Sequence, residues 1–433
     1  MERAPTVPLW SSYTISPRTQ VIPLQMSFVD RLASQYVFID RQRRNILAGE
    51  SEKLEREGRN FEGRTTEPLS ESSSSESDSE YTLPGGGYVR KPRVYNLCPR
   101  PRPALADITP IPETITADFL VEKLGFRRVR WEEPRVFADL EERIGAVFVG
   151  PPHQRQRWES SVRKANVVIR MARASIDHAN LDTHNYLRGG ITHDPTAKRP
   201  RRIDRCYTMH NIAALASLRN SRAVQDITSF QNAVLQGIAP RAWSDTRSII
   251  DAVVQRDWDL HVPFQLGNQG PYQPTAFSEV EYRFDLPDSM GRRDEDDHPS
   301  SIRGLTAVGA YPYTEGGLIL WNDRTVVDFP PGSSFFFLGA LTHYSFCAVE
   351  KPGYQMIITQ ACGARLHGYV ADGCEKRYTP HPEPEFPSRT AQKADRLARA
   401  GEAIGLLPTV TEWDAAEGQD LEDSILEFAS FGV

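Results

Sequence analysis

The stretch FPPGSSFFFLGALTHYSF, from Phe329 to Phe346, is the most informative part of this chain. A Pro-Pro-Gly turn leads into an apolar run of strand length, and the run ends on one histidine, His343. An imidazole at the end of a strand can serve as a metal ligand at the mouth of a small β-barrel, or as a structural side chain. Because one imidazole cannot hold an iron ion, a metal site would need further ligands elsewhere in the chain.

Short apolar runs separated by glycine and proline surround this stretch. They predict the antiparallel strands of one barrel or jelly roll, because several short strands with turn residues between them are typical of such layers. The runs are Ala276–Phe284, Leu305–Ala310, Gly317–Trp321, Thr325–Phe329, Ser334–Leu338 and Tyr354–Gln360.

The region before these runs is mainly helical in pattern. The run Ile144–Val149 predicts one strand, which two prolines stop. Apolar residues then recur at helical spacing: Trp158, Val162, Ala165, Ile169 and Ala172. Two further helices are expected in DITSFQNAVLQGIAPRAWSDTRSIIDAVVQRD, broken around Gly237 and Pro240. The folded part is therefore expected to be α+β, with its helices first and its β-barrel second.

The composition indicates that part of the chain has no packed core. A hydrophobic fraction of 39% and a mean hydropathy of −0.48 are low for a fully packed protein of 433 residues. The stretch Glu50–Pro101 contains few apolar residues, and its Ser/Glu/Asp run Ser70–Glu80 is expected to be a solvated linker, with phosphorylation as the alternative. Before it, Phe28, Leu32 and Tyr36 lie on one face of a predicted amphipathic helix.

These changes in composition and in the spacing of apolar residues divide the chain into four regions. Residues 1–105 form an N-terminal arm with one helix and a disordered linker, and residues 106–270 form a strand–helix and helical support region. Residues 271–378 form the barrel core, and residues 379–433 hold a Pro-rich segment, a helix around Ala391–Leu407 and an acidic tail. No apolar run approaches the roughly 18 residues of a membrane span, and no secretory segment is present, so we expect an intracellular protein.

The cysteines do not indicate a disulfide framework or a structural zinc site. Their number is odd and they form no CxxC pair. Cys362, His367 and Cys374 are close in sequence, but their irregular spacing makes zinc the weaker alternative there. The five are Cys98, Cys206, Cys347, Cys362 and Cys374.

A basic run, KRPRRIDR, interrupts the helical region. It predicts either a nuclear-import signal, and hence a nuclear protein, or a patch that contacts phosphates, with a solvated loop as the plain alternative. The net charge of −6 argues against a protein that coats a polyanion over its whole surface, but a local patch is compatible with DNA or RNA. The cations are Lys198, Arg199, Arg201, Arg202 and Arg205.

An ordered series of motifs resembles a known family. The chain runs from GAYPYTEGGLILWNDRTVVDFPPGS through a histidine to GYQMIITQACGARLHGYV. This series resembles the fungal TET/JBP-like 2-oxoglutarate/Fe(II) dioxygenases associated with Kyakuja–Dileera–Zisupton transposons, over Leu140–Gly373 and most closely over Ala307–Val370. The resemblance implies a double-stranded β-helix, or jelly roll, with helices packed on its outer face. It also implies Fe(II) and 2-oxoglutarate as cofactors and the oxidation of a methylated base flipped out of DNA.

The family holds iron with two histidines and one carboxylate, and an arginine binds the far carboxylate of 2-oxoglutarate. The second histidine corresponds to His343, whereas the family's His-Arg-Asp motif falls on Arg292, Arg293 and Asp294. The carboxylate is therefore present and the first histidine is an arginine. Arginine has no lone pair to give, and at ~4 Å and an effective dielectric of ~20 its charge repels a divalent ion by roughly 8 kcal/mol. Gln355 occupies the cosubstrate-arginine position, where it can hydrogen-bond a carboxylate but cannot neutralise it.

A rebuilt metal site is the competing interpretation. His298 lies four residues after Asp294, and a register shift in this acidic loop would bring it to face His343. An acidic loop with one histidine is more commonly solvated. The His-x-Glu of His381 and Glu383 follows His343 instead of preceding it, so its order excludes it as the family's pair.

Three functions remain open. The leading one is a TET/JBP-like dioxygenase homologue that has lost its iron and 2-oxoglutarate chemistry, a pseudoenzyme that survives as a nucleic-acid- or protein-binding relic or as a transposon passenger. The second is an active dioxygenase that oxidises methylated nucleobases with Asp294, His343 and a displaced His298; Arg365, which the resemblance places at a strand end, could then replace the lost arginine. The third is a small-molecule-binding, cupin-like scaffold, which needs a closed apolar pocket.

Overall fold

The computed structural model describes residues 20–24, 26–28, 31, 115–130, 134–149, 155–177, 186–194, 197–257, 260, 275–284, 294, 297–350, 352–371, 373–374, 398 and 401–413. The predicted linker, Arg292, and the His381–Glu383 pair lie outside these residues, as do Leu32 and Tyr36 of the predicted N-terminal helix. Of the helix expected around Ala391–Leu407, the structure describes residues 398 and 401–407, and residues 401–404 are helical.

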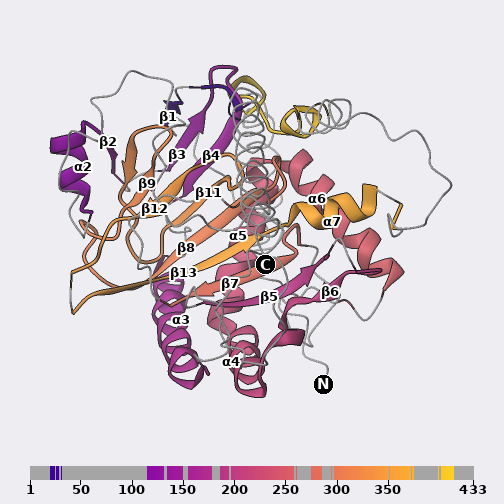
Figure 1. Cartoon of the computed structure of the whole chain (residues 1–433). Coiled ribbons are helices and arrows are strands. Elements are labelled where there is room, and N and C mark those ends of the chain that lie inside the picture. The colour runs from indigo at the N-terminus through magenta and orange to yellow at the C-terminus, as the bar shows by residue number, and fades with distance from the viewer. Residues whose placement is uncertain are drawn as a thin grey trace, which may run out of the picture.

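Two sheets form the body of the protein (Figure 1). In the described part of the chain the major sheet has nine strands, in the order β1 (Gln20–Pro23), β3 (Arg135–Ala138), β4 (Ile144–Val149), β11 (Ser334–Leu338), β8 (Ile302–Ala310), β13 (Tyr354–Ala361), β7 (Glu279–Arg283), β5 (Tyr186–Thr192) and β6 (Arg201–Arg202). The minor sheet has the order β12 (Tyr344–Phe346), β9 (Leu318–Leu320), β10 (Thr325–Val327) and β2 (Arg127–Val129). The core strands pair antiparallel, and only the β1–β3 and β2–β10 pairs are parallel among the described ladders.

The chain passes back and forth between the two sheets. It leaves the major sheet after β8, forms β9 and β10 in the minor sheet, returns for β11, crosses for β12 and returns for β13. Aromatic rings fill the space between the sheets: Phe337 lies 4.8 Å from Tyr344, and Phe329 lies 6.3 Å from Phe346, measured between ring centroids. The expected α+β class is confirmed, and the arrangement is consistent with a double-stranded β-helix.

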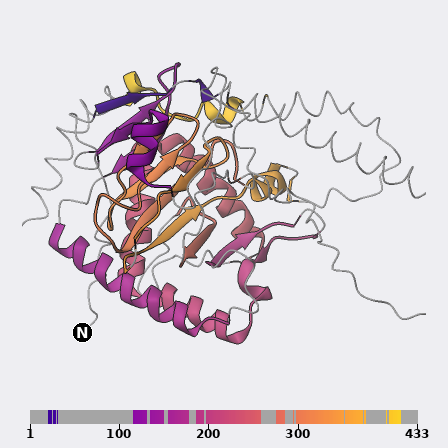
Figure 2. The same ribbon diagram turned by 60° about the vertical axis from the view of Figure 1, so that its left-hand side comes forward.

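Helices cover the other face of the major sheet (Figures 1 and 2). α3 (Arg155–Ser175) and α5 (Arg222–Ile238) pack on β8, and α4 (Met209–Asn220) packs beside α3. The predicted apolar face of α3 is buried at all five of its positions, and the break between α5 and α6 (Pro240–Arg256) lies where Gly237 and Pro240 predicted it. Further described helices include α2 (Ala117–Leu124), the 3-10 turn η4 (Ile203–Cys206) and α7 (Ala364–Ala371).

Two polar side chains fasten this helical layer to the sheet. The Trp158 indole N–H of α3 donates to the Gly332 carbonyl, 2.8 Å away, in the Pro-Pro-Gly turn that precedes β11. From α5, the buried Gln231 amide donates to the Thr306 hydroxyl (2.8 Å) and to the Ile358 carbonyl (3.1 Å). The helices are therefore held to β8, β11 and β13 by hydrogen bonds as well as by apolar packing.

Most of the predicted strands are confirmed, but three local expectations differ. His343 does not end the apolar strand, because β11 stops at Leu338 and a turn separates it from His343, which precedes β12. Arg365 lies in helix α7 instead of at a strand end. Residues 20–23, assigned to the N-terminal arm, form an edge strand of the major sheet. None of the described helices combines the length and apolar character needed to cross a membrane.

A buried carboxylate and guanidinium network as the candidate functional site

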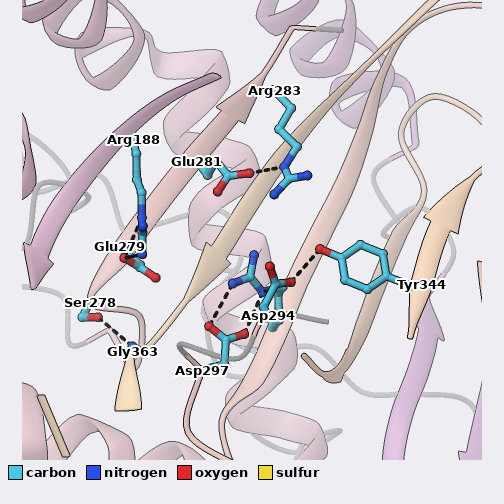
Figure 3. A network of polar contacts seen from close by, with 10 residues as sticks. Arg188, Ser278, Glu279, Glu281, Arg283, Asp294, Asp297, Tyr344 and Gly363 are labelled. Atoms are coloured by element: carbon cyan, nitrogen blue, oxygen red, sulfur yellow. Dashed lines mark hydrogen bonds and ion pairs between the residues drawn. The ribbon is translucent and has the colours of Figure 1, made fainter. Parts of the chain in front are cut away.

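Asp294, which the sequence resemblance predicts as a metal ligand, lies in a network of charged side chains (Figure 3). Its carboxylate oxygen Oδ2 accepts a hydrogen bond from the Tyr344 hydroxyl at 2.7 Å and lies 3.1 Å from Nε of Arg303. Arg303 comes from β8 and also binds Asp297 through two bonds of 2.8 Å, a bidentate pair. The carboxylate that would bind a metal is therefore engaged by a tyrosine hydroxyl and a guanidinium.

The charges in this pair are almost completely buried. The side chains of Arg303 and Asp297 are 6% and 1% exposed. Burial alone would lower the pKa of Arg303, but Asp294 and Asp297 together raise that pKa well above its ordinary value. Burial raises the pKa of Asp297 to about 7, against the opposing effect of Arg303. The guanidinium therefore stays charged at any pH at which the protein is folded.

A glycine makes room for this pair. A Cβ atom on Gly339 would lie 2.3 Å from Oδ2 of Asp297 and 3.1 Å from Nε of Arg303. The Gly339 carbonyl also accepts the Asp294 backbone N–H at 3.1 Å. The close approach of the ion pair to the backbone after β11 thus requires glycine at this position.

Strand β7 extends the network (Figure 3). Its alternate residues Glu279, Glu281 and Arg283 are buried on one face; Glu279 pairs with Arg188 of β5, and Glu281 pairs with Arg283. With Asp294 and Asp297, the network holds four carboxylates against the three guanidinium groups of Arg188, Arg283 and Arg303. The negative charges of Asp294 and Glu279 add to burial in raising the pKa of Asp297.

The sequence prediction of site residues missed this network. The segment EVEYR contained the signal, because charged residues alternate with apolar ones inside a predicted barrel strand, which places the charges on one face. The pairing of Arg303 with Asp294 had no comparable local signal.

The structure does not bring the predicted metal candidates together. Within the described residues, no group of three or more His, Cys, Asp or Glu side chains is placed to hold a metal ion, and this covers Asp294, His298 and His343. The backbone of His343 is fixed at both of its polar groups: its N–H donates to Oδ1 of Asn322 at 2.6 Å, and its carbonyl accepts from Trp321 at 2.9 Å.

Gln355, at the cosubstrate-arginine position, is buried and bound to its own fold. Its amide nitrogen donates to the Tyr311 hydroxyl (2.9 Å) and to the Gly316 carbonyl (2.7 Å). Tyr311 in turn donates to the Phe329 carbonyl at 2.6 Å. The amide thus links β13 to the turn before β9, while its oxygen has no hydrogen-bond partner in the structure.

His298 lies against His367 of α7. The two rings are stacked, with centroids 4.0 Å apart and an interplanar angle of 6°. His298 Nδ1 is 2.8 Å from the Ser300 hydroxyl, and the buried Nε2 of His367 has no hydrogen-bond partner among the residues that the structure describes. Burial lowers the pKa of His298 to about 4, and burial together with His298 lowers the pKa of His367 to about 3, so both rings are neutral.

Of the weaker zinc candidates Cys362, His367 and Cys374, Cys362 lies at the end of β13. It is fully buried, and burial raises the pKa of its thiol to about 12. Cys362 and His367 do not belong to any metal-binding group among the residues that the structure describes.

The predicted basic run includes β6 and most of η4, before α4, and four of its five cations are exposed. Arg202 is paired with Asp204 (Nε to Oδ1, 3.0 Å), and Arg201 lies 4.0 Å from Asp194. The other cations are exposed and have no ion-pair partner in the described part of the chain: Lys198, Arg199 and Arg205. α3, which packs on α4, adds further exposed cations of the same kind: Arg157, Arg163 and Lys164. The sequence analysis had assigned α3 only its buried face.

Comparisons with known proteins give only distant overlaps. No family model matches the sequence, and no curated protein matches it. Among solved structures, NgTET1 in complex with 5mC DNA overlaps 54% of this chain and 78% of its own, with 12% identity and a TM-score of 0.39. A 2OG-Fe(II) oxygenase family oxidoreductase from Burkholderia pseudomallei overlaps 51% of this chain and 87% of its own, with 10% identity and a TM-score of 0.26. IDO from Bacillus thuringiensis overlaps 51% of this chain and 93% of its own, with 10% identity and a TM-score of 0.21.

Proposed function

We propose that this chain is a TET/JBP-like dioxygenase homologue whose barrel no longer binds Fe(II) and 2-oxoglutarate, and which acts as a binding scaffold. The observation that carries the proposal is the Arg303 guanidinium against Asp294. Its Nε lies 3.1 Å from Oδ2 of Asp294, and its positive charge repels a metal ion at that carboxylate. The residues present do not fit the iron and cosubstrate of the family.

Two further contacts support the same proposal. Tyr344 donates to the same Asp294 oxygen and packs on Phe337, so apolar and hydroxyl groups fill the space between the sheets beside the carboxylate. Gln355 is bound to Tyr311 and Gly316, and its amide offers no positive charge to a dicarboxylate.

Anaerobic titration with Fe(II) and 2-oxoglutarate tests the loss of the metal site. We expect no saturable charge-transfer absorbance at millimolar cosubstrate, because the carboxylate is already paired with Arg303. The variant His343→Ala should behave like the natural chain. The double substitution Arg292→His with Gln355→Arg returns the two missing family groups, and it should still bind no metal while Arg303 remains.

Saturable absorbance in the natural chain that disappears in His343→Ala would overturn this part of the proposal in favour of an active dioxygenase. Binding by the double variant alone would show that the two substituted positions, and not the Arg303 pair, block the site.

We also propose that the basic run Lys198–Arg205 binds the phosphate backbone of a nucleic acid. The unpaired cations Lys198, Arg199 and Arg205 suit phosphates, since each neutralised phosphate of duplex DNA contributes about −0.9 to the slope of log K against log salt. Replacing all three with glutamine should weaken duplex binding several-fold at low salt and make the slope less negative by about 2–3. Fluorescence anisotropy across a salt series measures both quantities.

The matched control removes three cations that already have carboxylate partners: Arg143, Arg241 and Arg247. The control should change binding less than the triple substitution in the basic run. If it weakens affinity as much, and makes the slope as much less negative, then the net charge of the protein and not the basic run determines binding. A natural chain without measurable duplex or single-strand binding at low salt would refute the nucleic-acid partner itself.

A further inference from the structure

A short N-terminal segment is attached to the body although it is remote from it in sequence. The structure describes residues 20–24, 26–28 and 31, and its next described residue is Ile115, so residues 32–114 separate the segment from α2. In Figure 1, β1 lies at the edge of the major sheet beside β3.

The first contact of this segment is strand addition. Gln20 to Pro23 pair in parallel with Arg135 to Ala138, and the Leu24 N–H continues the ladder to the Ala138 carbonyl at 2.7 Å. Ile22 and Leu24 are buried against the body, whereas Val21 is exposed. Backbone pairing with alternate side chains in pockets is a general way of binding an extended peptide at a sheet edge.

The second contact is an aromatic anchor. Phe28 is 1% exposed and lies on Gly145 of β4, where a Cβ atom would meet its ring at 2.0–2.7 Å. The Phe28 backbone N–H donates to Oδ2 of Asp139 at 2.8 Å. Oδ1 of the same carboxylate accepts from the backbone N–H groups of Glu141 and Arg143 in the β3–β4 turn. The absence of a side chain on Gly145 thus makes the pocket for the ring.

The third contact is a buried ion pair. The Arg31 guanidinium donates to the Asp323 carboxylate in the β9–β10 turn, and both side chains are only 3% exposed. Arg31 also lies over the Phe28 ring, 5.5 Å from its centroid. The segment therefore bridges the edge of the major sheet and a turn of the minor sheet through three specific contacts.

We propose that the β3 edge, Gly145 and Asp323 form a peptide-binding site whose ligand is an extended strand followed by phenylalanine and, three residues later, arginine. Its resident occupant is the described part of residues 20–31 of this chain, and 83 sequence positions separate Arg31 from the next described residue, Ile115. Although Ile22, Leu24 and Phe28 pack in the main hydrophobic core, the segment is an exchangeable ligand of this site. This inference is independent of the proposed function.

The full chain with a specific protease site inserted in the Ser70–Glu80 run tests this proposal. After cleavage, the N-terminal fragment should stay with the body in size-exclusion chromatography at micromolar concentration. A synthetic peptide of residues 18–33 should displace it within hours, and the released fragment should then elute separately. Fluorescence anisotropy of the labelled peptide on the cleaved, fragment-depleted body gives its affinity.

Charge reversal provides the specific control. Arg31→Glu in the peptide should weaken its binding to the natural body at least about tenfold. Asp323→Lys in the body should restore the affinity for the Arg31→Glu peptide and weaken the affinity for the natural peptide. Phe28→Ala should weaken binding to a similar extent, and Val21→Thr, at the exposed strand position, should have little effect. If Asp323→Lys impairs folding, the Phe28→Ala and Val21→Thr peptides still give the comparison on the natural body.

Three results would overturn the proposal. The fragments could separate as soon as the chain is cleaved, or the fragment could resist displacement by millimolar peptide over several days. Binding could also be insensitive to both Phe28→Ala and Arg31→Glu.

Discussion

Replacing Arg303 with alanine is expected to lower the free energy of unfolding by about 3–5 kcal/mol, because it leaves Asp297 and Asp294 buried without their cation. The loss should come mainly from this uncompensated charge. The double substitution Arg303→Met with Asp297→Leu removes one charge of each sign and should recover a large part of the stability. Urea unfolding followed by circular dichroism measures these free energies.

A paired but exposed arginine is the matched control for this substitution. Arg241 binds Glu412 at 2.8 Å, yet both side chains are about half exposed, so Arg241→Ala should cost no more than about 1 kcal/mol. A loss for Arg303→Ala as small as that of Arg241→Ala would mean that the carboxylates find another partner, and it would remove the main support for a blocked metal position.

Acid should destabilise the protein through the stacked histidines, by about 3–6 kcal/mol between pH 7 and pH 4. His298 and His367 have folded-state pKa values lowered to about 4 and about 3, below the ordinary value of 6.5. The contribution of the neutral pair to stability is therefore complete above pH 6.5 and is lost as the pH falls. The reason is that the two imidazoles bind protons in the unfolded chain at a pH at which they do not bind them in the folded protein. Urea unfolding at half-unit pH steps measures the loss.

The double substitution His298→Gln with His367→Gln isolates this effect from that of the carboxylates. It should lower stability at pH 7 and flatten the pH dependence between pH 6.5 and pH 4. His210→Gln removes an exposed histidine of α4 and should leave the natural pH profile unchanged. Equal slopes in the natural chain and the double variant would contradict the assignment of acid sensitivity to the stacked pair.

Local patterns predicted most of the secondary structure. The five-position apolar face of α3 and the short runs that became β8 to β11 and β13 depend on neighbours within a few residues, and the sequence displays such neighbours directly. The Pro240 boundary of α6 follows from the same local chemistry.

The site could be predicted only in part, because its contacts join remote segments. Asp294 was a candidate from the resemblance, but its partners Arg303 and Tyr344 come from different sheets. The same reason explains the missed attachment of the N-terminal segment, since Arg31 and Asp323 are 292 positions apart. No periodicity within a short window reports such a pair.

The repeated crossing of the chain between the two sheets has a consequence for folding kinetics. β7 and β13 pair although Glu281 and Thr359, which face each other, are far apart in sequence, and two strands of the other sheet, β9 and β10, lie between β8 and β11 in the chain. The β3–β4 and β9–β10 ladders are closed by short turns, but the central ladders of the major sheet join strands that are remote in the chain, so the nucleus must close long loops before the sheet is complete. Folding is therefore expected to take milliseconds to seconds, and fragments that end within the barrel should expose unpaired strand edges and aggregate.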